Sequence, residues 1–213
     1  MFKEMLRTDN RGSTKSKVLG VGINDAPYQT AIKISGKIYT CPYFIRWVAM
    51  LTRCYSQRWL KKHPTYIGCY VVVEWHSFMM FKKWMQTQDW KNKHLDKDLL
   101  SFDSGVYSPD TCLFITPQIN SLFGTGSSKT TELPIGIHHR NNKYEVGVSM
   151  GNSKRVWIGS YNTIPEAIDA YIKAKTIATK KVMKQTNDLK TRKAIIAYLK
   201  YFTDKLILLK TGY

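Results

Sequence analysis

Residues 134–175 read PIGIHHRNNKYEVGVSMGNSKRVWIGSYNTIPEAIDAYIKAK, and the hydrophobic period of this segment changes once, from two to about 3.6. Apolar and polar side chains alternate in three successive runs, residues 136–140, 143–149 and 154–160. Such alternation is typical of strands with one buried face. Asn141-Asn142 and Gly151-Asn152, which separate the runs, are favoured in hairpin turns. The segment therefore predicts a three-stranded sheet.

A helix is predicted directly after the third run. Thr163-Ile-Pro-Glu166 is typical of a capping box with proline in the first turn, and small or apolar side chains recur on one stripe at Ala167, Ala170, Tyr171 and Ala174. Small alanines let a helix lie close to a sheet. The opposite sheet face is then expected to carry His138, Arg140, Lys143, Arg155, Trp157 and Gly159. A solvated basic face is the alternative, but an outward tryptophan beside an outward arginine favours binding.

These residues resemble the AP2/ERF-type DNA-binding domain, in which a three-stranded sheet enters the major groove and one helix packs behind it. The matching positions are Gly136-Ile137, Lys143-Tyr144, Arg155-Val-Trp-Ile-Gly159, Tyr161, Thr163, Glu166-Ala167 and Ala170-Tyr171. The resemblance implies that the DNA contacts are made by His138, Arg140, Lys143, Ser149, Arg155, Trp157 and Ser160. Where family members carry charged residues, this chain has His138, Gly147 and Ser149.

Charge favours a polyanionic partner. The 213 residues include 33 Lys and Arg against 15 Asp and Glu, a formal net charge of +18. The chain shows no signal peptide and no apolar run of the roughly 18 residues that a spanning helix needs, which predicts a cytoplasmic protein, in the host cell if it is phage-encoded. The cysteines lack close pairs, so a four-cysteine Zn²⁺ site and simple buried thiols both remain open for Cys41, Cys54, Cys69 and Cys112.

The chain upstream of the sheet predicts a separate domain. Helical spacing relates Phe44, Trp47, Met50, Leu51 and Cys54, a strand is predicted at 70–73, and a second helix at 75–85. We interpret these aromatic residues as core rather than as a ligand platform. Residues 124–131 have the composition of a linker. The predicted ranges are 1–39 for an N-terminal arm and strands, 40–123 for the first domain, 124–133 for a linker, 134–186 for the DNA-binding domain and 187–213 for a final helix.

The final helix carries an apolar stripe that needs a partner. The stripe consists of Ile195, Leu199, Phe202, Leu206 and Leu209. Packing on the first domain and pairing with a second copy, as a homodimer through the C-terminal helix, are both open. The predicted fold class is α+β.

Titratable residues gather at His94-Leu-Asp-Lys-Asp98, within a predicted order of strand, loop, strand and short helix. Thr116 is expected to cap the short helix, with Pro117 at its first position. Asn120, one turn in, would then point back toward the strand of Asp96. This arrangement brings a carboxylate and an amide together.

This layout resembles the ββα-metal core of HNH endonucleases. It is most similar to a branch found in phages, whose members join an HNH-like domain to an AP2-like domain and are homing endonucleases. The wider match comprises Trp47-x-x-Met50-Leu51-x-Arg53-Cys54-Tyr55, Pro64-x-Tyr66-x-Gly68-Cys69, Glu74-Trp75-x-x-Phe78-x-x-Phe81, Leu95-Asp96-Lys97-Asp98, Tyr107-Ser-Pro-Asp-Thr-Cys112 and Asn120. By that resemblance Lys97 occupies the position of the general base, and Asp96 and Asn120 hold Mg²⁺ or Mn²⁺, which suit hard oxygen ligands.

A lysine at position 97, where a general base is expected, leaves three explanations open. A lysine near its usual pKa of about 10.4 is protonated at neutral pH and cannot take a proton from water. Either burial lowers its pKa, or it steadies the phosphate while His94 or Asp98 acts as the base, or cleavage has been lost. The leading hypothesis is a site-directed double-stranded DNA endonuclease. A non-cutting DNA-binding regulator is the second hypothesis, and an RNA-binding or structural phage protein is the third.

Overall fold

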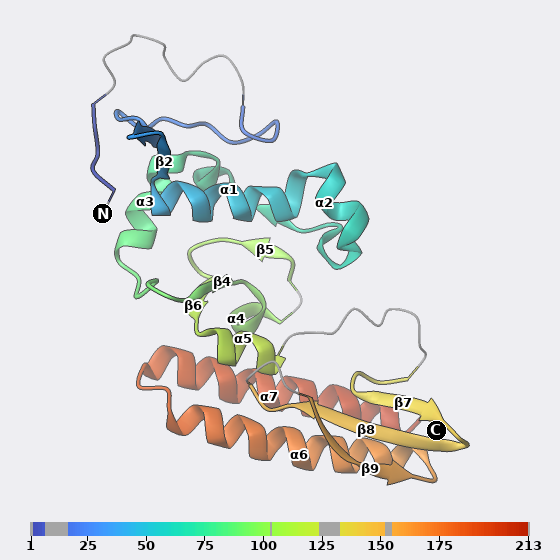
Figure 1. Cartoon of the computed structure of the whole chain (residues 1–213). Helices are drawn as coiled ribbons and strands as arrows, with labels where there is room; N and C mark the ends of the chain where they lie inside the picture. Colours follow the sequence, from blue (N-terminus) through green and yellow to red (C-terminus); the bar gives the residue numbers. More distant parts are fainter. Residues whose placement is uncertain (1, 7–16, 103, 124–132, 152–154, 213) are drawn as a thin grey trace. The chain divides into compact units, whose positions relative to one another are not determined.

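The computed structural model describes residues 2–6, 17–102, 104–123, 133–151 and 155–212. The fold is α+β, and the chain divides into two compact units (Figure 1). The N-terminal unit comprises Met1–Lys91 and Asp103–Phe114, and the C-terminal unit comprises Asn92–Phe102 and Ile115–Tyr213. Within the described residues, no helix is both long enough and apolar enough to cross a membrane.

The N-terminal unit is mainly helical. Its first two strands form an antiparallel hairpin, and β3 pairs in parallel with β5. The elements are β1 (Ala31–Ile34), β2 (Lys37–Thr40), α1 (Pro42–Tyr55), α2 (Gln57–Lys62), η1 (Pro64–Tyr66), β3 (Tyr70–Val71), η2 (Val73–His76), α3 (Phe78–Gln86), β5 (Val106–Tyr107) and most of β6 (Leu113–Ile115).

Aromatic side chains form the core of this unit, as predicted. Trp47, Trp75, Phe78 and Phe81 are almost fully buried, and the Trp47 Nε1–H donates to the Trp75 carbonyl oxygen at 2.7 Å. The second predicted helix starts later than expected, at Phe78, because the Ser77 hydroxyl accepts the Met80 N–H and caps it there. The strand predicted at residues 70–73 is also shorter, Tyr70–Val71, because η2 begins at Val73.

The C-terminal unit contains the predicted sheet. Its elements are β4 (His94–Asp96), α4 (Asp98–Ser101), α5 (Pro117–Phe123), β7 (Ile137–Arg140), β8 (Lys143–Ser149), β9 (Arg155–Tyr161), α6 (Ile164–Lys184) and α7 (Leu189–Lys210). The sheet is antiparallel in the order β7-β8-β9. The first turn has positive φ at both Asn141 and Asn142, 49° and 55°, as a primed hairpin turn requires.

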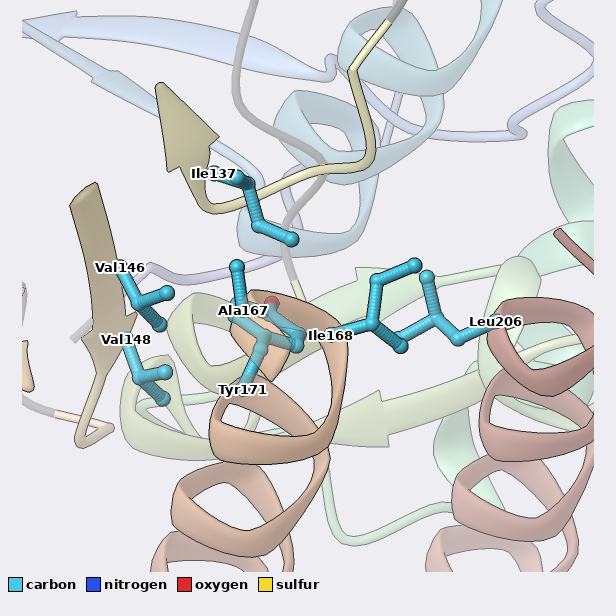
Figure 2. Packing of buried hydrophobic residues seen from close by; sticks show 7 residues of the cluster. All are labelled: Ile137, Val146, Val148, Ala167, Ile168, Tyr171 and Leu206. Atoms are coloured by element: carbon cyan, nitrogen blue, oxygen red, sulfur yellow. The ribbon is translucent and has the colours of Figure 1, made fainter. Parts of the chain in front are cut away.

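One face of the sheet packs on α6. The capping box is present: the Thr163 hydroxyl accepts the Glu166 N–H, and the Glu166 carboxylate accepts the Thr163 N–H. The buried cluster joins the sheet, α6 and α7, as Figure 2 shows for Ile137, Val146, Val148, Ala167, Ile168, Tyr171 and Leu206. The backbone of Gly136 lies so close to Tyr171 that a Cβ there would be 2.0 Å from its ring.

The stripe of α7 finds a partner within its own unit. α7 packs along α6, with Ile195 and Leu206 buried, whereas Leu209 is largely exposed. The homodimer therefore stays a prediction that the fold does not require.

The compact units do not follow the predicted ranges. Residues 92–102 and α5 were expected within the first domain, but they belong to the C-terminal unit. The Phe102 ring stacks on Tyr201 at 4.8 Å, and the Phe123 ring meets the edge of Tyr198 at 4.8 Å. These contacts link residues far apart in sequence. Most of the predicted linker and part of the N-terminal arm lie outside the described residues.

Candidate nucleic-acid interface and acidic segment

The register of the sheet decides which side chains share a face. Val146 and Val148 of the central strand are fully buried against the helix side, so Lys143, Glu145, Gly147 and Ser149 point the other way. Residues directly opposite one another across a ladder lie on the same face. Arg140 pairs with Lys143, His138 with Glu145, Trp157 with Gly147 and Arg155 with Ser149. We call this side the outer face.

A β-bulge lets β9 place both Trp157 and Ser160 on the outer face. Trp157 pairs with Gly147 but Gly159 pairs with Val146, so Ile158 is the extra residue. Strict alternation would have put Ser160 on the helix side. The bulge restores it to the outer face, opposite Glu145. The expectation that Gly159 points outward is wrong, because its partner Val146 faces the helix.

All seven residues predicted to touch DNA therefore lie on the outer face: His138, Arg140, Lys143, Ser149, Arg155, Trp157 and Ser160. Two more residues lie on this face that were not among the predicted DNA contacts. Glu145 is its acidic residue, and Gly147 lies at its centre. The alternation of residues 143–149 contained both positions, but neither residue type signals nucleic-acid binding by itself.

The outer face presents positive charge and an aromatic ring to solvent. Trp157 is 66% exposed, which is unusual for a side chain of that size. Within the described residues, no ion pair neutralises Arg140, Lys143 or Arg155. An exposed tryptophan among unpaired cations is the chemistry that contacts phosphates and base edges.

The acidic segment, residues 94–98, differs from the outer face because its charged side chains already form hydrogen bonds and an ion pair within the chain. Asp96 Oδ1 accepts the N–H groups of Asp98 at 3.1 Å and Leu99 at 2.8 Å, so the carboxylate caps the first turn of α4. Burial raises the pKa of the Asp96 carboxyl from 3.8 to about 6, against the lowering effect of the Leu99 N–H. Asp96 thus has a structural role, and its predicted metal-binding role stays a prediction.

Lys97 is buried, and its ammonium donates to the Asp98 carboxylate. An ammonium has no lone pair to accept a proton. In this arrangement Lys97 is an ion-pair partner rather than a base. Of the two alternative bases that the sequence predicted, His94 is exposed on β4, and Asp98 is the ion-pair partner of Lys97.

The predicted metal ligand Asn120 lies on α5, which packs beside β4. The cap was predicted correctly: the Thr116 hydroxyl accepts the Ile119 N–H at 3.3 Å, with Pro117 as the first helical residue. Asn120 is half-buried. The two bonds to Asp96 Oδ1 leave acceptor capacity on the carboxylate, since it has two oxygens and about four lone-pair sites. The donor set is therefore of the oxygen type that Mg²⁺ or Mn²⁺ prefers.

Among the described residues, no group of three or more His, Cys, Asp or Glu side chains is placed to hold a metal ion. The four cysteines all lie in the described part of the chain, where each is buried and carries a thiol rather than a disulfide. The Cys41 Sγ lies 3.7 Å from the Tyr28 hydroxyl. The Zn²⁺ site stays a prediction for which this geometry offers no support.

Comparison with known proteins adds no family: no family model, no curated protein and no solved structure matches this chain.

Proposed function

We propose that this protein binds double-stranded DNA through the outer face of the β7-β8-β9 sheet. The observation that carries the proposal is the joint exposure of Arg155 and Trp157 on one face, which also carries Arg140 and Lys143 toward its other end. A major groove about 12 Å wide accepts a β-ribbon, and arginine can form two hydrogen bonds to guanine there. The resemblance of residues 136–171 to the AP2/ERF-type domain supports the same use of this face.

The net charge of +18 supports the proposed affinity for DNA, apart from any preference for one sequence. Lysine and arginine contacts to phosphate release counterions, so binding should weaken steeply as salt rises. Charge alone does not select a sequence. Selection would come from the outer face, because its side chains reach base edges rather than only the backbone.

A selection experiment tests this proposal. Duplexes bound from a random double-stranded library should converge on one sequence, and anisotropy titration should show it bound more tightly than random duplex. The Arg140→Glu/Arg155→Glu variant should lose at least about 30-fold in affinity, because two groove contacts worth about 1–3 kcal/mol each add to about 2–6 kcal/mol.

The matched control is Lys180→Glu/Lys200→Glu. These lysines are exposed on α6 and α7, and the pair changes net charge by the same amount. The control should lose much less, mainly through the salt-dependent part of binding. Equal losses in the two variants, or tighter binding to RNA than to DNA, would contradict the proposal.

Metal-dependent phosphodiester cleavage is the second candidate function. It is favoured by the position of Asp96, a carboxylate on β4 beside the helix that carries Asn120. These two residues would hold Mg²⁺ or Mn²⁺, which supplies charge stabilisation at the scissile phosphate when bound. His94 is the exposed group that could take a proton from water, while Lys97 is held in its ion pair with Asp98.

Cleavage is tested with the selected duplex in Mg²⁺, in Mn²⁺ and in EDTA, beside Asp96→Ala. An endonuclease cuts in the metal-containing reactions alone and loses cutting in the variant. Binding with no metal-dependent cutting would favour a regulator that occupies sites without cleaving them.

A further inference from the structure

Gly147 occupies the centre of the outer face, in the middle of the central strand β8. Its cross-strand partner on β9 is Trp157. A Cβ built on Gly147 would lie 2.5 Å from Arg155 Nε and 3.2 Å from both Arg155 Cδ and Cγ. The Arg155 side chain therefore lies flat across the strand, in the space that any other residue at 147 would fill.

The backbone conformation at residue 147 does not require a glycine. The described glycines with positive φ do not include Gly147, so its conformation is open to an L-residue. The three nearest atoms to the added Cβ all belong to Arg155. A glycine inside a strand weakens it and commonly marks a place of close approach. Here the approaching group is the side chain of Arg155.

This placement would restrict the Arg155 side chain before DNA binds. Arg155 begins opposite Ser149 at one end of the ladder and crosses β8 at Gly147, the cross-strand partner of the exposed Trp157. A free arginine would have to give up much of its rotamer freedom on binding. A side chain already laid across the sheet gives up less, and its guanidinium starts from a defined position.

We propose that Gly147 is a specificity-determining positioning residue, which lets the Arg155 side chain cross the central strand and presents its guanidinium on the outer face for contact with base edges of duplex DNA. This inference rests on the proposed DNA binding. It concerns where the arginine is presented, and Gly147 itself need not touch DNA.

The test is a cycle of Gly147→Ala, Arg155→Ala and the double variant, titrated with the selected duplex and with random duplex. Gly147→Ala should weaken binding to the selected duplex about 10-fold and change binding to random duplex by less than about twofold. In the Arg155→Ala background, Gly147→Ala should have no further effect. Independent, multiplying losses would overturn the inference.

Two measurements without DNA separate this inference from the proposed function. Relaxation of the Arg155 Nε–Hε group by NMR should show a more mobile side chain in Gly147→Ala than in the wild type. If the new methyl group lowers Tm, Arg155→Ala should restore it, because the clash is with that side chain. An unchanged Nε–Hε order parameter, or a fall in Tm that Arg155→Ala does not relieve, would overturn the positioning role.

Failure of the wild type to bind any duplex would overturn the DNA-binding proposal, and with it the use assigned to Arg155. Wild-type binding with an unaffected Gly147→Ala variant would overturn the positioning role alone.

Discussion

The outer face of the sheet and the acidic segment 94–98 use charge in opposite ways. On the outer face, Arg140, Lys143 and Arg155 have no ion-pair partner within the described residues, and Trp157 is turned to solvent. In the acidic segment, Asp96 caps α4 and Lys97 pairs with Asp98. Charges that a fold leaves uncompensated are available to a ligand, whereas charges already paired inside the chain must first be released. The DNA-binding proposal therefore has firmer support than the cleavage proposal.

The largest effect should come from truncating the outer face. Arg155→Ala/Trp157→Ala should weaken binding to the selected duplex by at least about 100-fold, because an arginine base contact and a large aromatic contact are lost together. Gel-shift titration at fixed salt measures the loss. Lys200→Ala/Leu208→Ala on α7 is the control, since it also removes one cation and one exposed hydrophobic side chain. Comparable losses in the two variants would show that this face has no special role.

Asp96→Asn should stabilise the protein at pH 7 by about 1–2 kcal/mol. The folded carboxyl has a raised pKa of about 6 against 3.8, so the folded state binds more protons between those pH values. Wild-type stability contributed by this group is therefore greatest below pH 4 and falls as pH rises to 6. Asparagine keeps an acceptor oxygen for the Asp98 and Leu99 N–H groups but carries no charge.

Urea denaturation at pH 4 and pH 7 checks this expectation. The gain of Asp96→Asn should vanish at pH 4, and Asp96→Ala should be less stable than Asp96→Asn by about 1 kcal/mol through the lost cap. A destabilised Asp96→Asn at pH 7 would mean that the charge itself is needed. Stabilisation by Mg²⁺ of the wild type, but not of the variants, would support Asp96 as a metal ligand. It would also show that the acidic segment, like the outer face, keeps charge available for a ligand.

The smallest effect concerns Lys175, a basic residue that the fold uses internally. Lys175 is buried on α6, its ammonium donates to the Leu122 carbonyl oxygen, and it lies 5.5 Å from the Phe123 ring centroid. Burial lowers its pKa from 10.5 to about 8, so between those values the unfolded chain binds more protons. Wild-type stability should therefore rise with pH from about 8 toward 10.5.

Lys175→Met should remove this rise, which we expect to reach about 1 kcal/mol between pH 7.5 and 9.5. Thermal unfolding at several pH values measures it for both proteins. DNA affinity at pH 7 should stay within about twofold of wild type, because this cation is not exposed. If the stability of Lys175→Met still rises with pH as in the wild type, another titratable group causes the rise. A large loss of affinity would mean that basic residues outside the outer face also contribute to binding.

Local signals predicted the elements from β7 to α7 well, whereas α4 lies where a loop was predicted. The alternation in 143–149, the paired asparagines and the Thr163 capping box each depend on neighbours a few residues away, and each appears in the structure. The cap at Thr116 was predicted for the same reason. These features follow from backbone sterics and hydrogen bonding over one or two turns of chain.

Long-range contacts produced the departures. The bulge at Ile158 arises from pairing with β8, so alternation alone could not show that Gly159 faces the helix. The transfer of residues 92–102 and α5 to the C-terminal unit depends on rings such as Tyr198 and Tyr201, about a hundred residues away from Phe102 in the sequence. The capping role of Asp96 was also missed, because it required knowing that α4 begins at Asp98.

The sequence by itself determined the order of strands and helices from β7 to α7, the apolar side of β8 and the excess of positive charge, because these are properties of residues and their spacing. Tertiary structure decided which polar residues share the outer face, that Arg155 lies over Gly147, and that Asp96 and Lys97 are held by their own chain. The physical reason is that availability for binding depends on what surrounds a side chain. Residues distant in the sequence provide those surroundings once the sheet and helices have packed.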